Sequence, residues 1–229
     1  MPGKRKEIEV VATADFHGIL PKIKRADVLV IAGDVFPIAK YLSYKKVLFN
    51  QLRFYDEEFL PWLERTLKVV KRIVIVGGNY DYVLQQEMID FPKGVVYLKD
   101  ETFEYKGWRF YGFPWSNLKN STKVAFTLPD SKLELKAAAI PDTDVLVSHA
   151  PIYGFGDLNR GGRHKGLPAL RAALKRQNIA HMICGHIHNG FGEYLYKSCE
   201  IHAVALTECL DSGEYRLRKS RIQRFVLRD

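Results

Sequence analysis

The chain has 229 residues, of which 47% are hydrophobic and 27% are charged, and its basic residues exceed its acidic ones by 35 − 26 = 9. This length and composition predict one well-packed domain over residues 1–229, and no apolar run approaches the roughly 18 to 20 residues that cross a bilayer. The positive charge suits an anionic substrate; a nucleic-acid partner is compatible with it but not indicated, and no membrane partner is expected.

The first two thirds of the chain predict buried strands that alternate with helices. The basic start, MPGKRK, leads into a strand pattern without a secretory signal, so we expect a cytoplasmic protein. Short β-branched runs at 8–14, 27–33, 73–77 and 144–148 each end in polar residues, as buried strands do when the following loops carry a site. Apolar residues at helical spacing predict two helices, one with Phe59, Leu63, Leu67 and Val70, its start obscured by Pro61, and one with Leu167, Leu170 and Leu174.

The rest of the chain is richer in antiparallel strands. Aromatic runs on either side of a Lys-Gly turn predict a hairpin over 102–115 with a buried aromatic face, and residues 191–206 and 220–227 add further strands. Two packed sheets with helices outside them reconcile both parts, which makes the fold class α/β (α+β). The three cysteines, Cys184, Cys199 and Cys209, have no metal-ligand spacing and are expected to be reduced and structural.

Acids, an amide and imidazoles follow the predicted strands. Each alone is more typical of a turn, a helix cap or a hydrogen-bonded histidine than of a ligand. Together they predict a metal site, because seven such residues each end an apolar run: Asp15, His17, Asp34, Asn79, His149, His186 and His188. Carboxylate, amide and imidazole donors without a thiolate favour manganese, iron, zinc, cobalt or nickel.

In order, these motifs resemble the signature of the calcineurin-like metallophosphoesterase superfamily: D-x-H, G-D, G-N-H-(D/E), H-(A/G) and G-H-x-H. The match extends from about residue 9 to residue 190 and is most similar to the compact, cytosolic phosphodiesterase branches. The resemblance implies a four-layer sandwich of two mixed β-sheets flanked by helices. It also implies two divalent ions, with manganese the leading expectation, and the following ligands: Asp15, His17 and His188 for the first ion, Asn79, His149 and His186 for the second, and Asp34 as the bridge.

One position departs from the superfamily pattern. Tyr80 stands where relatives carry a histidine that assists the leaving group, and a phenol with a pKa near 10 is a poor acid at neutral pH. Asp81 keeps its place but loses its usual partner. We therefore predict a preference for esters with good leaving groups, such as aryl phosphodiesters, over alkyl monoesters. A packing or base-stacking role for Tyr80 is the alternative.

The loop NRGGRHKG, residues 159–166, offers substitutes for the missing acid. Arg163 and His164 are candidates to contact the phosphate or to donate the proton, and a solvated surface loop is the alternative. The leading function is a dinuclear phosphodiesterase that hydrolyses a small or nucleotide-like phosphoester. The alternatives are a DNA or RNA nuclease of the same superfamily and a non-catalytic metal-binding scaffold.

Overall fold

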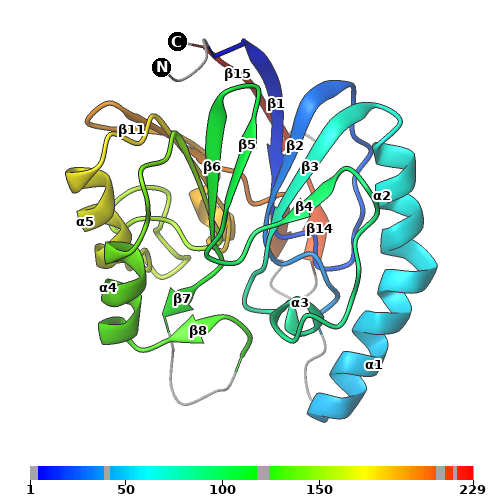
Figure 1. The fold of residues 1–229 in the computed structure, drawn as a ribbon. Coiled ribbons are helices and arrows are strands. Elements are labelled where there is room, and N and C mark those ends of the chain that lie inside the picture. Colours follow the sequence, from blue (N-terminus) through cyan, green and yellow to red (C-terminus); the bar gives the residue numbers. More distant parts are fainter. Residues whose placement is uncertain (1–4, 39–41, 118–123, 210–214, 219–220, 229) are drawn as a thin grey trace.

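A computed structural model describes residues 5–38, 42–117, 124–209, 215–218 and 221–228. Two β-sheets lie face to face between two groups of helices (Figure 1). The first sheet is mixed: four strands are parallel, and β15 pairs with β1 in the antiparallel sense. Its order is β15 (Gln223–Leu227), β1 (Ile8–Thr13), β2 (Ala26–Ala32), β3 (Val70–Val76) and β4 (Val95–Tyr97).

The second sheet has six strands, of which the four central ones are parallel and the two edge strands antiparallel to their neighbours. Its order is β11 (Gly192–Tyr196), β12 (Cys199–Ala203), β10 (His181–Cys184), β9 (Val145–Ser148), β6 (Trp108–Phe113) and β5 (Thr102–Tyr105). Two short pairs complete the strands: β7 (Ser116–Asn117) with β8 (Thr127–Leu128), and β13 (Thr207–Cys209) with β14 (Tyr215–Leu217).

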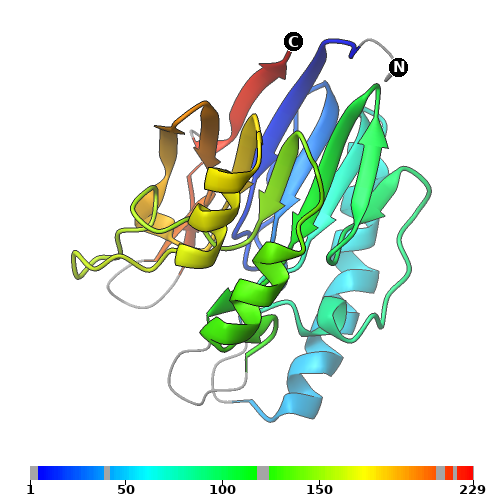
Figure 2. The same cartoon turned by 60° about the vertical axis from the view of Figure 1, so that its left-hand side comes forward.

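Helices cover the outer face of each sheet (Figures 1 and 2). One long helix on the first sheet comprises α1 (Tyr44–Phe54), a π-helical turn (Tyr55–Phe59) and α2 (Leu60–Thr66). The second sheet carries α4 (Asp130–Ala138) and α5 (Pro168–Arg176). Two short helices, α3 (Tyr82–Gln85) and the 3₁₀ turn His188–Gly190, follow strand ends.

Three apolar layers hold this sandwich together. The strands are apolar on both faces because each sheet is covered on both sides. In β1, Val10 faces the second sheet in a layer that contains Val28 and Trp108, whereas Val11 faces the helices together with Phe59. A third layer lies between the second sheet and α4 and α5. The predicted four-layer sandwich is therefore confirmed.

The local predictions hold for the strands and in part for the helices. The hairpin turns at Lys106 and Gly107, both with positive φ, and the aromatic residues of β6 are buried. The helix predicted from Phe59 begins earlier, at residue 44, and Val70 is the first residue of β3 rather than part of a helix. Pro61 has no N–H to donate to the preceding helical turn. The π-helical turn ends at Phe59, just before this proline, so that α2 begins with Pro61 in its first turn.

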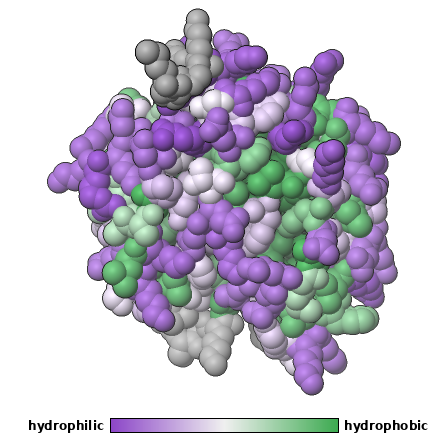
Figure 3. Space-filling view, viewed as in Figure 1, coloured by the Kyte–Doolittle hydropathy of each residue, from purple (hydrophilic) through white to green (hydrophobic). Residues whose placement is uncertain are grey.

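Among the described residues, no helix is both long and apolar enough to cross a bilayer. On the face shown in Figure 3, hydrophilic residues separate smaller hydrophobic patches. Cys184 and Cys199 are buried free thiols, as expected for structural cysteines, while the side chain of Cys209 lies outside the described residues.

Asp144 directly precedes β9 and links this strand to β6 and to the N-terminal segment. Its carboxylate accepts hydrogen bonds from the backbone and guanidinium of Arg109 and from Arg5, at 2.5 to 3.3 Å. Burial opposes ionisation, but the bonds from Arg109 prevail and hold the pKa of Asp144 below its usual value. The ionised carboxylate therefore stabilises the folded chain.

Asp144→Asn is expected to lower the free energy of unfolding by about 1 to 3 kcal/mol at pH 7. Because the folded pKa of Asp144 is depressed, its stabilisation is complete above the unfolded pKa near 3.9 and is lost as the pH falls through the folded value. Urea unfolding of both proteins at pH 7 and pH 3 measures this change. Asp142→Asn, at an exposed aspartate that pairs with Arg109, is the control. The same difference at both pH values would contradict the expectation.

Candidate metal centre

Loops at the ends of five parallel strands, β1, β2, β3, β9 and β10, bring the predicted ligands together at one end of the two sheets. Their donor atoms form two groups, within each of which all atoms lie within 4.8 Å of one another: Asp15, His17 and His188, and Asp34, His149 and His186. The superfamily resemblance implied Asn79, His149 and His186 for the second ion, with Asp34 as the bridge. In the structure Asp34 belongs to the second group, and Oδ1 of Asn79 lies 3.0 Å from Nε2 of His149.

The first group combines a buried carboxylate with two stacked imidazoles. Nε2 of His188 lies 3.6 Å from Oδ1 of Asp15 and 3.2 Å from Nε2 of His17. Nδ1 of His188 donates to the carbonyl of Thr207 at 2.8 Å, which leaves the lone pair of Nε2 directed into the group. Burial lowers the pKa of His17 to about 3, so its imidazole is neutral and able to bind a cation.

The second group has the same character. Nδ1 of His149 donates to the carbonyl of Ala32 at 2.9 Å, so that Nε2 faces Oδ1 of Asn79 at 3.0 Å and Oδ2 of Asp34 at 3.4 Å. The His186 ring lies beside it, with ring centroids 4.9 Å apart. Burial favours the neutral imidazole, but the Asp34 carboxylate outweighs it and raises the pKa of His149 to about 9.

These contacts show what the centre is suited to hold. Oxygens of Asn79 and Asp34 lie 3.0 and 3.4 Å from Nε2 of His149, an arrangement that a proton on this nitrogen, or a cation in its place, stabilises. The oxygen and imidazole donors match the preferences of divalent first-row metals, and no thiolate is among them. The residues therefore fit two divalent ions, one in each group.

The backbone around the centre is held in an uncommon conformation. Asp15, His17, Asp34 and His186 all have positive φ, between 48° and 68°, which residues other than glycine adopt rarely and at a cost of about 1 kcal/mol or more each. Bonds between the loops compensate: the N–H of Asp15 donates to Gly33 at 2.9 Å and that of His17 to Asp34 at 3.0 Å. Backbone strain at residues that could bind an ion is typical of a functional site.

Asp81 stabilises this backbone through hydrogen bonds to both loops. Its two carboxylate oxygens accept four backbone N–H bonds at 2.8 to 3.1 Å, from Asp34, Val35, Phe36 and Gly78. Its side chain is fully buried and does not line the pocket. Gly78 is required here as well, because a Cβ would lie 2.3 Å from Oδ1 of Asp34. These contacts indicate that Asp81 positions the backbone of Asp34 and Gly78 and does not face a substrate.

A pocket of ≈ 280 Å³ opens over the two groups, lined by Asp34, Asn79, His186 and His188 among the candidate ligands. Tyr80 also lines it, at the position predicted to face the substrate, and its ring lies 5.6 Å from that of His17. The β7–β8 pair forms another wall of the pocket, through Ser116, Asn117 and Thr127.

Arg163 and His164 are not brought to this pocket. Nδ1 of His164 pairs with Oδ1 of Asp157 at 2.7 Å, and the other oxygen of Asp157 accepts the N–H groups of Gly154 and Gly166. Arg163 is exposed, and its N–H donates to Asn159 within the same loop. The geometry favours the alternative of a surface loop, anchored by Asp157, over a substrate contact.

Three residues beyond the motifs also shape the centre. The Tyr215 ring lies 4.3 Å from that of His17 and lines the pocket. Thr207 Oγ1 donates to the carbonyl of Asp15 at 2.7 Å, and Arg221 donates to that of His188 at 2.8 Å. Sequence reasoning missed them because they follow the last motif, where no spacing links a residue to a ligand.

Comparison with known proteins bears on this centre. A family model described as calcineurin-like phosphoesterase matches residues 9–190. UPF0046 protein T07D4.2 of Caenorhabditis elegans is 28% identical over 213 residues, which cover 83% of this chain and 54% of that protein. Metallophosphoesterase domain-containing protein 1 of Homo sapiens is 28% identical over 214 residues, which cover 80% of this chain and 61% of that protein. The chain thus spans little more than half the length of these curated relatives.

The fold also has solved counterparts. The protein TT1561 of Thermus thermophilus superposes with a TM-score of 0.56 over 87% of this chain and 90% of that one, at 12% sequence identity. At this identity the likeness establishes the arrangement of sheets and helices and carries no information on the substrate.

Proposed function

Because the chain belongs to the calcineurin-like phosphoesterase family, we propose that it is a cytoplasmic, dinuclear metal-dependent phosphodiesterase that hydrolyses a small or nucleotide-like phosphoester. The observation that carries the proposal is the pair of donor groups at the floor of one pocket. Two divalent ions, manganese first among the candidates, supply Lewis acidity and lower the pKa of a water when bound at such a centre.

The protein's own residues have distinct tasks in this proposal. Asp15, His17 and His188 would hold one ion, and Asn79, His149 and His186 the other, with Asp34 shared. Hydrogen bonds to Ala32 and Thr207 fix the two imidazole tautomers that leave Nε2 available for binding. The basic chain, with a net charge of +9, favours the approach of an anionic ester.

A metal-dependence assay tests the proposal. Chelator-treated protein is expected to be inactive on mono-, di- and cyclic phosphoesters, and Mn²⁺ is expected to restore hydrolysis with two equivalents bound. Aryl diesters are expected to react fastest. Two bound equivalents without hydrolysis of any ester in the panel would favour the scaffold, and preferential cleavage of DNA or RNA would favour the nuclease.

Tyr80→His is expected to shift the substrate preference. The imidazole would supply a proton donor on the pocket wall, so kcat/KM for an alkyl phosphomonoester should rise about 10- to 100-fold relative to that for an aryl diester. Steady-state kinetics with both esters at saturating Mn²⁺ measure the ratio. Tyr80→Phe, which removes only the hydroxyl, is the matched control, and an unchanged ratio in the histidine variant would show that Tyr80 does not occupy the acid position.

A further inference from the structure

A second cluster of metal-binding side chains lies on strands β10 and β12 of the six-stranded sheet. These strands are parallel neighbours whose register pairs His181 with Glu200 and Ile183 with His202. Because side chains alternate along a strand, His181, Glu200 and His202 project from the same face. This is the face toward the first sheet, since Ile183 belongs to the apolar layer between the sheets.

The three side chains converge on one point. Oε2 of Glu200 lies 3.5 Å from Nδ1 of His181 and 3.9 Å from Nε2 of His202, and the three donor atoms all lie within 4.8 Å of one another. Tetrahedral ligands at metal distances near 2.1 Å are about 3.3 to 3.5 Å apart, so only a small closure is needed to surround an ion.

The tautomer of His202 is set by a neighbour. Nε2 of Gln223 donates to the carbonyls of Gly192 and Ala203, which turns Oε1 of Gln223 toward Nδ1 of His202 at 3.3 Å. Since Oε1 can only accept, Nδ1 of His202 carries the proton and Nε2 carries a lone pair aimed at the cluster. A metal-ligating histidine is commonly oriented in this way through its other nitrogen.

The nitrogens that face the cluster lack a hydrogen bond. Nε2 of His202 and Nδ1 of His181 are buried and have no hydrogen-bond partner among the described residues, and His202 is only 4% exposed. The ring of His202 is fixed by stacking on Phe225, with centroids 3.8 Å apart and planes 4° apart. Burial lowers the pKa of His202 to about 4 and also lowers that of His181, so both imidazoles are neutral ligands near pH 7.

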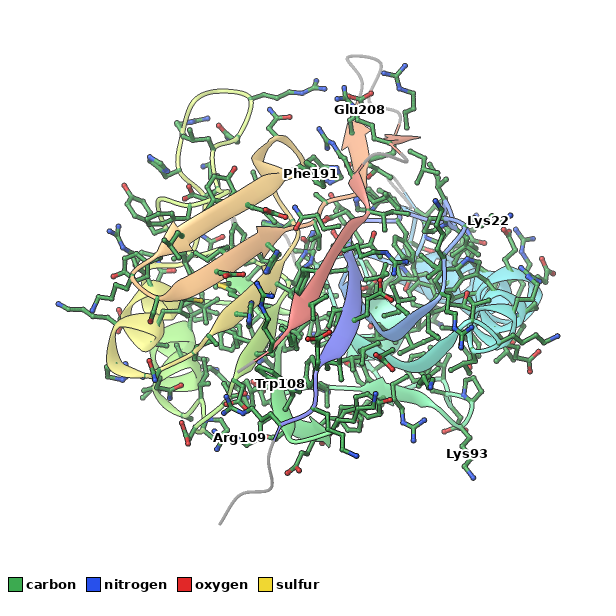
Figure 4. All side chains as sticks on the ribbon, turned by 90° about the horizontal axis from the view of Figure 1, so that it is seen from above. Lys22, Lys93, Trp108, Arg109, Phe191 and Glu208 are labelled. Atoms are coloured by element: carbon green, nitrogen blue, oxygen red, sulfur yellow. The ribbon has the colours of Figure 1, made fainter. Side chains whose placement is uncertain are left out.

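We propose that His181, His202 and Glu200 form a third metal site, which binds one borderline divalent ion such as Zn²⁺, Ni²⁺ or Co²⁺. Two imidazoles and one carboxylate suit such ions and leave a fourth position to water or an exogenous ligand. The site is separate from the phosphoesterase centre. Trp108, whose ring lies 6.4 Å from that of His181, is in the lower half of the view in Figure 4, whereas Glu208, which follows the Thr207 contact to the centre, is near its top.

Titration calorimetry of the chelator-treated protein with Zn²⁺ tests the proposal. The wild type is expected to bind one equivalent more than His202→Asn. Glu200→Gln should weaken that equivalent at least about tenfold, and because the Glu200 side chain is 61% exposed this variant leaves the core packing intact. Glu104→Gln, at an exposed glutamate on the far edge strand of the same sheet, is the matched control and should bind as the wild type does.

The result does not depend on the phosphoesterase centre. If that centre failed to bind zinc, the wild type would still show one equivalent that the Glu200 and His202 variants weaken or lose. Anomalous diffraction from zinc-soaked crystals is expected to show a peak bonded to Nδ1 of His181 and Nε2 of His202. Equal stoichiometry and affinity in the wild type and Glu200→Gln, with no such peak, would leave the two histidines as stacked core residues and overturn the proposal.

Discussion

Asp34→Asn is expected to lower kcat/KM with an aryl phosphodiester by at least about a thousandfold, equivalent to roughly 4 kcal/mol of transition-state stabilisation. The substitution keeps the shape of the side chain but removes the charge that both ions would share in the proposed centre. Asp34 is 2% exposed, and its carboxylate lies 3.4 Å from Nε2 of His149. Water and dissolved anions therefore have no room to compensate for the lost negative charge. Without a bridging carboxylate, two cations in adjacent groups repel each other, and we expect one of them to be lost.

Kinetics and metal analysis of the same samples measure the effect. The variant should retain its fold by circular dichroism and bind about one equivalent of manganese less than the wild type. Asp27→Asn is the matched control, because Asp27 lies at the opposite end of β2, the strand that precedes Asp34, and accepts bonds from Glu9 and Lys106. A variant that keeps two equivalents and activity within tenfold of wild type would remove Asp34 from the bridging position.

Asp81→Asn is expected to lower the free energy of unfolding by about 3 to 5 kcal/mol, which corresponds to a fall in Tm of roughly 10 °C for a chain of this size. The carboxylate accepts four backbone N–H groups, whereas an amide offers one oxygen and sets an NH₂ group against two of those donors. The buried donors then remain unsatisfied, and the strained turn at Asp34 loses its support.

Thermal unfolding of the chelator-treated variant separates this effect from metal binding. Asp56→Asn, at an exposed aspartate of the long helix, should change Tm by less than about 2 °C. Manganese affinity should fall together with stability, since the same four bonds position Asp34. If Asp81→Asn unfolded at the wild-type temperature, its carboxylate would not be holding the two loops together, and a direct role in chemistry would have to be reconsidered.

The strands could be predicted because apolar runs identify them, and β1 and β2 are parallel neighbours, so Asp15 and Asp34 follow strands that end at the same edge of one sheet. His149 follows a strand of the other sheet, and its place beside Asp34 is predicted only through the superfamily resemblance. The limits of the long helix were harder to predict, because Pro61 obscures where the helix starts. The helix begins at Tyr44, and a π-helical turn precedes the proline.

The environment of the centre depends on long-range packing and could not be predicted. Tyr215 reaches His17 only because β14 pairs with β13, which is itself held over the centre by Thr207. His164 was a reasonable candidate from its loop composition, yet Asp157 draws it away from the pocket through a contact that no motif encodes. Asp81 sits in a recognised motif, but its use as an acceptor of four N–H groups emerges only when the loops fold around it.

The pairing of β1 with β15 has a consequence for how the protein is made. Ile8 lies opposite Leu227, so one edge of β1 stays without its hydrogen-bonded neighbour until β15, far along the chain, has been synthesised. Contacts of such large sequence separation slow folding and leave an apolar strand edge open to other nascent chains. We expect lower growth temperature, slower translation or added chaperones to raise the soluble yield.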